Sequence, residues 1–306
     1  MLINTLLLIV GFVLLICGAN AFVEGASALA TRFKVPKIII GLTVVAIGTS
    51  IPEIVVTLSS LFHGTSDMAV GNVLGSNIAN VLLILGITSM ITPLAIKKKT
   101  TQYQIPFVLF ITVLLMWFGM QYGAITRYAS MVFLALFLLF VGYLYFNAKK
   151  EIVEAEQTPE ISLEKILLYL ILGGAALIFG GDLTVKSAIN LAQALHVSNR
   201  IIGLTVVAIG TSLPELVTCI VAAYKKHAGL VLGNIIGSNI FNILFVLGIS
   251  GLVRPINFEY SFFIDSAIAV VSTVFLLLFA IYRQKLTRRM GAFFFACYIG
   301  YILYLI

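Results

Sequence analysis

The chain has 306 residues, of which 61% are hydrophobic and only 10% are charged, and its mean hydropathy is +1.12. Water cannot solvate most of such a chain, so it must face lipid or other helices, and we predict an integral membrane protein. The net charge of +7 does not indicate a nucleic-acid partner, because the basic residues lie in short connections rather than on one soluble face.

Apolar runs of about 20 residues, the length that crosses a ~30 Å hydrocarbon core, recur along the chain. The first run has no Lys or Arg before it and no small-residue cleavage pattern, so we expect a retained helix rather than a signal peptide. Cys17, Cys219 and Cys297 all lie in apolar runs and do not form a disulfide framework. The runs predict ten spans, near 2–22, 36–62, 68–92, 104–121, 126–147, 164–184, 198–223, 229–253, 260–282 and 289–305.

The distribution of Lys and Arg predicts the topology. With the N-terminus outside, 15 of the 19 basic residues lie in inner connections and 4 in outer ones. By the positive-inside rule, we expect both termini to face outward from a multi-pass protein of the cell membrane.

The chain repeats itself at an offset of 162 residues. "GLTVVAIGTSIPE" at 41–53 returns as "GLTVVAIGTSLPE" at 203–215, and "GNVLGSNIAN" at 71–80 returns as "GNIIGSNIFN" at 233–242. This similarity indicates an internal duplication.

The duplication predicts the fold class, an all-α polytopic membrane protein of ten helices. We expect a five-helix repeat at 1–147, an inner linker at 148–163 and a second five-helix repeat at 164–306. Because five is odd, the second repeat is inverted across the membrane, which is an architecture of secondary transporters.

Each repeat carries a proline inside an apolar run, Pro52 in the second span and Pro214 in the seventh. A proline removes an amide donor, clashes with the carbonyl four residues earlier and disfavours helical dihedrals in the residue before it. We therefore expect Ile51 and Leu213 to leave helical geometry, and both spans to be broken at mid-depth.

Glu53 and Glu215 directly follow the breaks and are the acidic residues that we expect deep in the membrane. An ionisable group there costs at least ~2.5 kcal/mol, so it is a candidate functional group. The two carboxylates, with backbone carbonyls freed at 46–49 and 208–211, form an all-oxygen set suited to a hard divalent cation such as Ca²⁺. No His or Cys lies at ligand spacing, which argues against zinc or copper. A structural pair of glutamates that share a proton is the alternative.

Polar residues of the third and eighth spans repeat as well. Ser76 and Asn80 are four residues apart, hence on one helical face, and so are Ser238 and Asn242. That face is expected to complete the site between the two glutamates.

The first and sixth spans carry glycines at matched positions, including Gly11 with Gly173 and Gly18 with Gly180, which we interpret as close helix packing. Near the ends of these spans lie polar residues that we interpret as interfacial or boundary groups: Asn20, Glu24, Asp182 and Lys186.

The doubled motifs resemble the alpha repeats of the calcium/cation antiporter superfamily, specifically prokaryotic sodium/calcium exchangers. The stretches that carry the resemblance are "VVAIGTSIPEIVVT" with "GNVLGSNIANVLLILG", and "VVAIGTSLPELVTC" with "GNIIGSNIFNILFVLG". The resemblance covers both halves. It implies ten helices around a diamond of four ion sites, one for Ca²⁺ and up to three for Na⁺, and first and sixth helices that slide as a gate.

The same resemblance implies roles for individual positions. Calcium would be held by Glu53, Glu215 and the carbonyls of Thr49 and Thr211. One sodium site would use Ala46, Ser50, Ser76 and Glu215, its symmetry mate would use Ala208, Ser212, Ser238 and Glu53, and Asn80 and Asn242 would border the middle position.

The function that we expect is a secondary active antiporter, not an enzyme, that exchanges Ca²⁺ for Na⁺ by alternating access with two glutamates shared by competing ions. It needs no cofactor besides these transported ions and no partner besides the bilayer, and its oligomeric state is left open, a monomer being sufficient. Asn242 stands where potassium-dependent relatives have an acid, which argues against potassium dependence.

Three alternatives remain. An H⁺-coupled Ca²⁺/cation antiporter is the main one, although the doubled "GTSxPE" favours sodium over protons. A calcium channel would show flux without an opposing ion gradient. A membrane-embedded hydrolase is disfavoured because Ser50 and Ser212 have no His or Lys partner in the sequence pattern.

Overall fold

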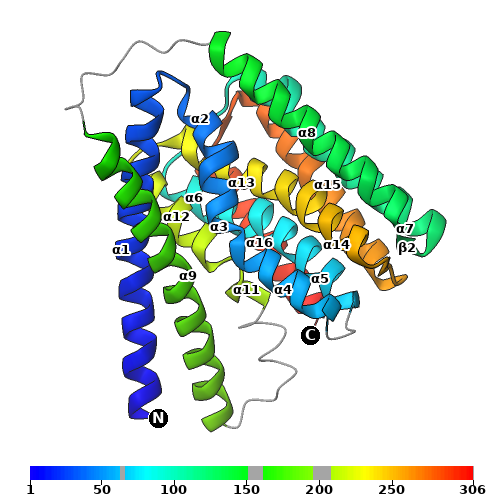
Figure 1. Ribbon diagram of the computed structural model, residues 1–306, viewed down its shortest axis with the longest axis horizontal. Coiled ribbons are helices and arrows are strands. Elements are labelled where there is room, and N and C mark those ends of the chain that lie inside the picture. Colours follow the sequence, from blue (N-terminus) through cyan, green and yellow to red (C-terminus); the bar gives the residue numbers. More distant parts are fainter. Residues whose placement is uncertain (63–65, 151–160, 196–207, 306) are drawn as a thin grey trace.

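The computed structural model describes residues 1–62, 66–150, 161–195 and 208–305, and it is almost entirely helical (Figure 1). Within these residues, seven helices are long and apolar enough to cross a membrane, and a bent pair of helices forms an eighth candidate span. A multi-pass membrane protein was predicted and is found. The arrangement as ten inverted helices stays a prediction, because the expected span at 198–223 lies partly outside the described residues.

The elements recur at the offset of the sequence repeat. For example, α4, η2 and α6 of the first half have the same lengths as α12, η5 and α14 of the second. The first half contains α1 (Leu2–Arg32), α2 (Lys37–Ile40), the π-helical η1 (Gly41–Val45), α3 (Ala46–Thr49), α4 (Ile51–Phe62), α5 (Ser66–Ile78), η2 (Ala79–Ile84), α6 (Leu85–Ile91), η3 (Thr100–Gln104), α7 (Ile105–Tyr122) and α8 (Arg127–Lys150). The second half contains α9 (Leu163–Ala194), α11 (Ala208–Gly210), α12 (Leu213–Tyr224), α13 (Ala228–Ile240), η5 (Phe241–Val246), α14 (Leu247–Val253), α15 (Ser261–Arg283) and α16 (Arg288–Leu305).

Two short antiparallel strand pairs join the halves at their loops. Strand β1 (Leu94–Ala95) pairs with β4 (Lys285–Leu286), and β2 (Ala124–Ile125) pairs with β3 (Ile256–Asn257). Each pair therefore links a loop of the first half to a loop of the second.

The break in the second span lies between α3 and α4, which are bent by 45°. The residue that leaves helical geometry is Ser50 (φ −87°, ψ 11°), and its counterpart before α12 is Ser212 (φ −87°, ψ 6°). The expectation that Ile51 and Leu213 leave the helix is wrong, because each is the first residue of the following helix. Proline is tolerated in a first helical turn, where amides lack partners anyway, so the break moves to the serine before it.

Helices α1 and α9 are longer than the predicted spans at 2–22 and 164–184. They contain 31 and 32 residues, which at ~1.5 Å per residue is about 46–48 Å and exceeds a ~30 Å hydrocarbon core. The two helices lie side by side at one edge of the molecule (Figure 1).

Backbone touches backbone where α1 and α9 cross. A Cβ atom on Gly18 would come within 2.9 Å of the Gly173 carbonyl oxygen, and one on Gly180 within 2.9 Å of the Gly11 carbonyl oxygen. The glycines at these matched positions thus permit an approach that a side chain would prevent.

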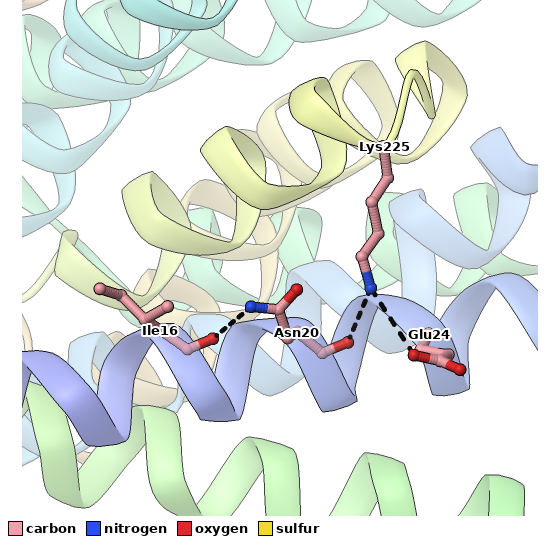
Figure 2. Close-up of polar contacts among 4 residues, drawn as sticks. All are labelled: Ile16, Asn20, Glu24 and Lys225. Carbon is pink, nitrogen blue, oxygen red and sulfur yellow. Dashed lines mark hydrogen bonds and ion pairs between the residues drawn. The ribbon is translucent and has the colours of Figure 1, made fainter.

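A lysine from the end of α12 contacts the other face of α1 (Figure 2). Lys225 Nζ donates to the Asn20 carbonyl oxygen at 3.3 Å and lies 3.7 Å from Glu24 Oε2. At the matched positions of the second half, Lys186 and Asp182 instead pair with each other along α9 at 2.8 Å. The two halves therefore use equivalent boundary positions for different contacts.

Replacing Gly18 with alanine is expected to separate α1 from α9 and to destabilise the protein by about 1–3 kcal/mol, the usual cost of overpacking. The matched control is Gly142→Ala in α8, since a Cβ atom there meets nothing within 4 Å. Thermal unfolding of the purified variants in detergent compares them. An equal melting temperature for both variants would contradict the close crossing.

Candidate functional site

Two carboxylates lie at the centre of the protein, each at the start of the second half of a broken helix. Glu53 in α4 is 0% exposed and Glu215 in α12 is 1% exposed. Ser50 Oγ donates to Glu215 Oε1 at 2.9 Å, and Ser76 Oγ donates to Glu53 Oε1 at 3.4 Å. Because Ser50 belongs to the break of the first half and Glu215 to that of the second, the two breaks meet at one site.

Four serines surround these carboxylates. Ser50 Oγ lies 3.0 Å from Ser238 Oγ, and Ser212 Oγ lies 3.3 Å from Ser76 Oγ. Each contact joins the break of one half to α5 or α13 of the other. The family resemblance groups Ser50 with Ser76 and Ser212 with Ser238, whereas the hydrogen bonds join each serine to a serine of the other half.

Four buried acceptor oxygens in this region have no hydrogen-bond partner within the described part of the chain. They are Glu53 Oε2, Glu215 Oε2, Asn80 Oδ1 and Asn242 Oδ1. A buried oxygen without a donor is energetically costly, and a cation is the partner that all four could share. The positions form two matched pairs, one member from each half.

The unpartnered asparagine oxygens are oriented by a network of amides between α5 and α13. Asn80 Nδ2 donates to Asn239 Oδ1 at 2.9 Å, and Asn242 Nδ2 donates to Asn77 Oδ1 at 3.2 Å. Asn77 and Asn239 also donate to each other's carbonyl oxygens at 3.3 and 3.4 Å. The amide groups of Asn80 and Asn242 are thereby used by the protein, which leaves their oxygens available.

Asn80 and Asn242 are each the second residue of a π-helical segment, η2 and η5. Such segments disturb the regular carbonyl-to-amide ladder and are frequent at functional sites. Sequence reasoning placed the two asparagines at the site but assigned no role to Asn77 and Asn239. The signal for both is the repeated "GSN" that contains them.

The threonines before the breaks are held by asparagines of the opposite half. Thr49 Oγ1 donates to Asn234 Oδ1 at 3.1 Å, and Thr211 Oγ1 donates to Asn72 Oδ1 at 3.4 Å. Sequence reasoning missed this role of Asn72 and Asn234, although both belong to the repeated "GN" of the motif.

The carbonyls expected to be free are partly used. The Ala46 carbonyl oxygen accepts from the Ser50 amide at 3.1 Å, whereas the Ser212 amide donates to the Ile209 oxygen at 3.1 Å and not to that of Ala208. A carbonyl oxygen has two lone pairs, so Ala46 retains capacity for a further partner.

The donors assembled here are carboxylate, hydroxyl and amide oxygens. Among the residues that the structure covers, no group of three or more His, Cys, Asp and Glu side chains forms a metal site of that kind. Oxygen donors with about two negative charges suit Na⁺ and Ca²⁺ rather than soft transition metals.

Comparisons with known proteins agree with this chemistry. The family described as sodium/calcium exchanger protein matches residues 3–146 and 165–306. Sodium/calcium exchanger MaX1 of Methanosarcina acetivorans is 32% identical in an alignment that covers 99% of this chain and 98% of MaX1. Inner membrane protein YrbG of Escherichia coli is 39% identical over 266 residues, which cover 83% of this chain and 81% of YrbG.

A solved structure of the sodium-calcium exchanger NCX_Mj, soaked with Na⁺ and Ca²⁺, has a TM-score of 0.87 at 33% identity and covers 99% of this chain and 98% of its own. The family match spans both halves, and the similarity in sequence and structure extends over nearly the whole chain. The resemblance stated from the motifs is confirmed: this chain belongs to the sodium/calcium exchanger family, within the calcium/cation antiporter superfamily.

Proposed function

We propose that this protein exchanges Ca²⁺ for Na⁺ by alternating access, and that Glu53 and Glu215 are shared by the competing ions. The observation that carries the proposal is the set of four unpartnered oxygens on these glutamates and on Asn80 and Asn242. Buried acceptors without donors, placed in matched pairs around a carboxylate couple, have the composition of a cation site.

Electrostatics explain why the ions compete. One Ca²⁺ cancels the charge of the two carboxylates, and so do two Na⁺ ions. Binding both kinds together would leave surplus positive charge in a core of low dielectric constant, where uncompensated charge is strongly unfavourable. Occupancy by calcium and by sodium is therefore mutually exclusive.

We assign the ligands as the family resemblance implies. Calcium takes the side chains of Glu53 and Glu215 and the carbonyls of Thr49 and Thr211. The flanking sodium positions take Ala46, Ser50 and Ser76 with Glu215, and Ala208, Ser212 and Ser238 with Glu53, while Asn80 and Asn242 border the middle. The hydrogen bond from Ser50 to Glu215 supports this assignment. Ser76 and Ser238 instead contact residues of the opposite grouping, Glu53 and Ser50.

The contacts of α1 and α9 with the breaks support alternating access. A Cβ atom on Gly48 would come within 2.7 Å of Phe22 Cζ in α1, and one on Gly210 within 2.6 Å of Val185 Cγ2 in α9. A displacement of the α1 and α9 pair therefore acts directly on Gly48 and Gly210, each two residues before the serine of its break. The smooth glycine crossing within that pair permits the two helices to move as a unit.

For topology we propose inverted repeats at 1–147 and 164–306, a cytoplasmic linker at 148–163, and both termini outside the cell membrane. The recurrence of element lengths between the halves supports the division. A single chain carries the whole central site, so a monomer suffices for the proposed exchange.

Sodium coupling is tested first. In proteoliposomes loaded with Na⁺ and diluted into Na⁺-free buffer, ⁴⁵Ca²⁺ uptake is expected, because sodium leaving the site makes the carboxylates available to calcium. A pH gradient of equal magnitude without Na⁺ is expected to drive none. Uptake driven by protons alone would replace sodium with H⁺ as the coupling ion, and uptake without any gradient would indicate a channel.

Changing either Glu53 or Glu215 to glutamine is expected to lower this uptake at least about 100-fold, since one remaining carboxylate cannot neutralise a divalent ion in the core. Initial ⁴⁵Ca²⁺ uptake rates at matched protein content measure the effect. The control is Glu259→Gln, the same change in the exposed connection before α15. Wild-type uptake by either core variant would rule out the shared carboxylates.

Exchange of three Na⁺ for one Ca²⁺ is expected to be electrogenic, because three monovalent ions and two carboxylates sum to +1 whereas the calcium-loaded core is neutral. An inside-positive potential, set by inward K⁺ diffusion with valinomycin, is then expected to accelerate Na⁺-driven Ca²⁺ uptake. Uptake rates that do not respond to the potential would exclude this stoichiometry.

A further inference from the structure

Asn72, in α5, connects the two halves of the protein through the opposite ends of one side chain. Its Oδ1 accepts a hydrogen bond from Thr211 Oγ1 at 3.4 Å. Its Nδ2 donates in the other direction, to Thr57 Oγ1 at 3.1 Å in the same half. Thr57 is 0% exposed.

Asn234, in α13, makes the matched connection in the second half. Its Oδ1 lies 3.1 Å from Thr49 Oγ1, whose hydroxyl is shared with the Val45 carbonyl at 3.0 Å. Its Nδ2 donates to Cys219 Sγ at 3.2 Å, and the thiol in turn faces the Val231 carbonyl at 4.0 Å. Cys219 is 0% exposed and stands where the first half has Thr57, since the two positions are 162 residues apart.

The hydrogen-bond acceptor on Thr57 determines which end of the Asn72 amide faces the break, and the acceptor on Cys219 does the same for Asn234. An asparagine amide has one acceptor oxygen and two N–H donors, so its orientation follows from the partners of both ends. Without the acceptor on Thr57, the Asn72 NH₂ group would keep only the Glu53 carbonyl oxygen, at 3.4 Å. Without the Cys219 thiol, the buried NH₂ group of Asn234 would have no partner among the described residues. In both cases the amide is held less firmly and can turn towards another partner. The hydroxyl of Thr211 would then lose its contact with Asn72, and that of Thr49 would lose Asn234 and keep only the carbonyls of its own helix.

These threonines lie directly at the breaks. Thr49 precedes Ser50, whose hydroxyl donates to Glu215 Oε1 at 2.9 Å, and Thr211 precedes Ser212, whose hydroxyl contacts Ser76. If Asn72 or Asn234 turns, Thr211 or Thr49 therefore loses a hydrogen bond that holds it in place. Each of these threonines carries a backbone carbonyl that we assign to calcium.

We propose that Thr57 and Cys219 are positioning residues that set calcium affinity by orienting Asn72 and Asn234 against the threonines at the breaks. The inference rests on the proposed function, because it assigns the carbonyls of Thr49 and Thr211 to calcium. The flanking sodium positions use other carbonyls and the serines. Loss of either positioning residue thus weakens calcium binding and leaves sodium binding nearly unchanged.

The two halves differ in the strength of the hydrogen bond that the asparagine NH₂ group donates. A hydroxyl oxygen is a better hydrogen-bond acceptor than a thiol sulfur. The hydrogen bond from Asn72 Nδ2 to Thr57 is therefore stronger than that from Asn234 Nδ2 to Cys219, whereas the Asn234 oxygen has a second donor in Ser238 Oγ at 3.4 Å. Removing the acceptor costs more affinity at Thr57 than at Cys219.

The experiment compares Thr57→Val with Thr218→Val, the same nearly isosteric change at two buried positions. Thr218 is 1% exposed, and its Oγ1 has no hydrogen-bond partner among the described residues. Thr57→Val is expected to raise the Ca²⁺ concentration for half-maximal uptake about tenfold, which corresponds to about 1.4 kcal/mol. The maximal rate and the Na⁺ concentration for half-maximal exchange are expected to stay within about twofold of the wild type, and Thr218→Val is expected to change none of the three.

Conservative variants separate positioning from packing. Thr57→Ser restores the acceptor and is expected to restore the wild-type Ca²⁺ concentration dependence. Cys219→Ala is expected to raise the half-maximal Ca²⁺ concentration, whereas Cys219→Ser is not. Equal behaviour of Thr57→Val and Thr218→Val, or a parallel loss of Na⁺ and Ca²⁺ affinity, would overturn the proposal.

Calorimetric titration of Ca²⁺ into the purified protein gives a readout that does not depend on coupling to sodium. If Glu53→Gln abolishes exchange while Thr57→Val binds Ca²⁺ like the wild type, the positioning role fails and the proposed function stands. If the wild type binds Ca²⁺ but does not exchange it for Na⁺, the proposed function fails, and the tenfold loss of Ca²⁺ affinity in Thr57→Val still decides the positioning role. A wild type that binds no Ca²⁺ overturns both.

Discussion

Two carboxylates buried where water cannot reach them are the constraint on which the rest of this structure depends. Glu53 and Glu215 are both essentially unexposed, and each has one oxygen bonded to a serine and one without a donor. A protein that only had to be stable would supply donors for all of these oxygens, because burying unpaired acceptors is unfavourable. Leaving matched oxygens open is instead consistent with a site whose missing partner is an ion.

The backbone around the site follows from that constraint. In a continuous helix a ladder of hydrogen bonds joins each carbonyl to an amide four residues on, whereas a carbonyl released from this ladder has both lone pairs available to a cation. Two features interrupt this ladder. The breaks at Ser50 and Ser212 do so in the helices that carry the two glutamates. The π-helical segments that contain Asn80 and Asn242 do so in the helices that pack on them. Irregular backbone of this kind is tolerated in a membrane only where protein or a polar cavity surrounds it.

The sequence predicted which residues form the site better than it predicted their hydrogen-bond partners. Glu53, Ser76 and Asn80 were recognisable because polar residues in an apolar run, repeated 162 positions later, have few purposes other than a shared site. The serine contacts between halves were not, since they depend on how the halves pack. The displacement of Ile51 from the helix was predicted wrongly, because the proline rule describes helix interiors and Pro52 lies in a first turn, so that Ser50 leaves the helix instead. The lengths of α1 and α9 were underestimated, because the apolar run ends near Asn20 and Asp182 whereas the helix does not.

The duplication makes the centre symmetric but not its surroundings, and the difference bears on how such a protein can change conformation. The residues assigned as ligands are of the same types in both halves, so ligand type alone does not favour one orientation over the other. The contacts outside the core do differ. Lys225 of α12 reaches across to Asn20 and Glu24 of α1, whereas Lys186 and Asp182 pair within α9 itself. A displacement of α1 against α12 must break the first set of contacts, while a displacement of α9 leaves the second intact. These boundary contacts therefore contribute an energetic difference between two orientations of the halves that does not come from the ions.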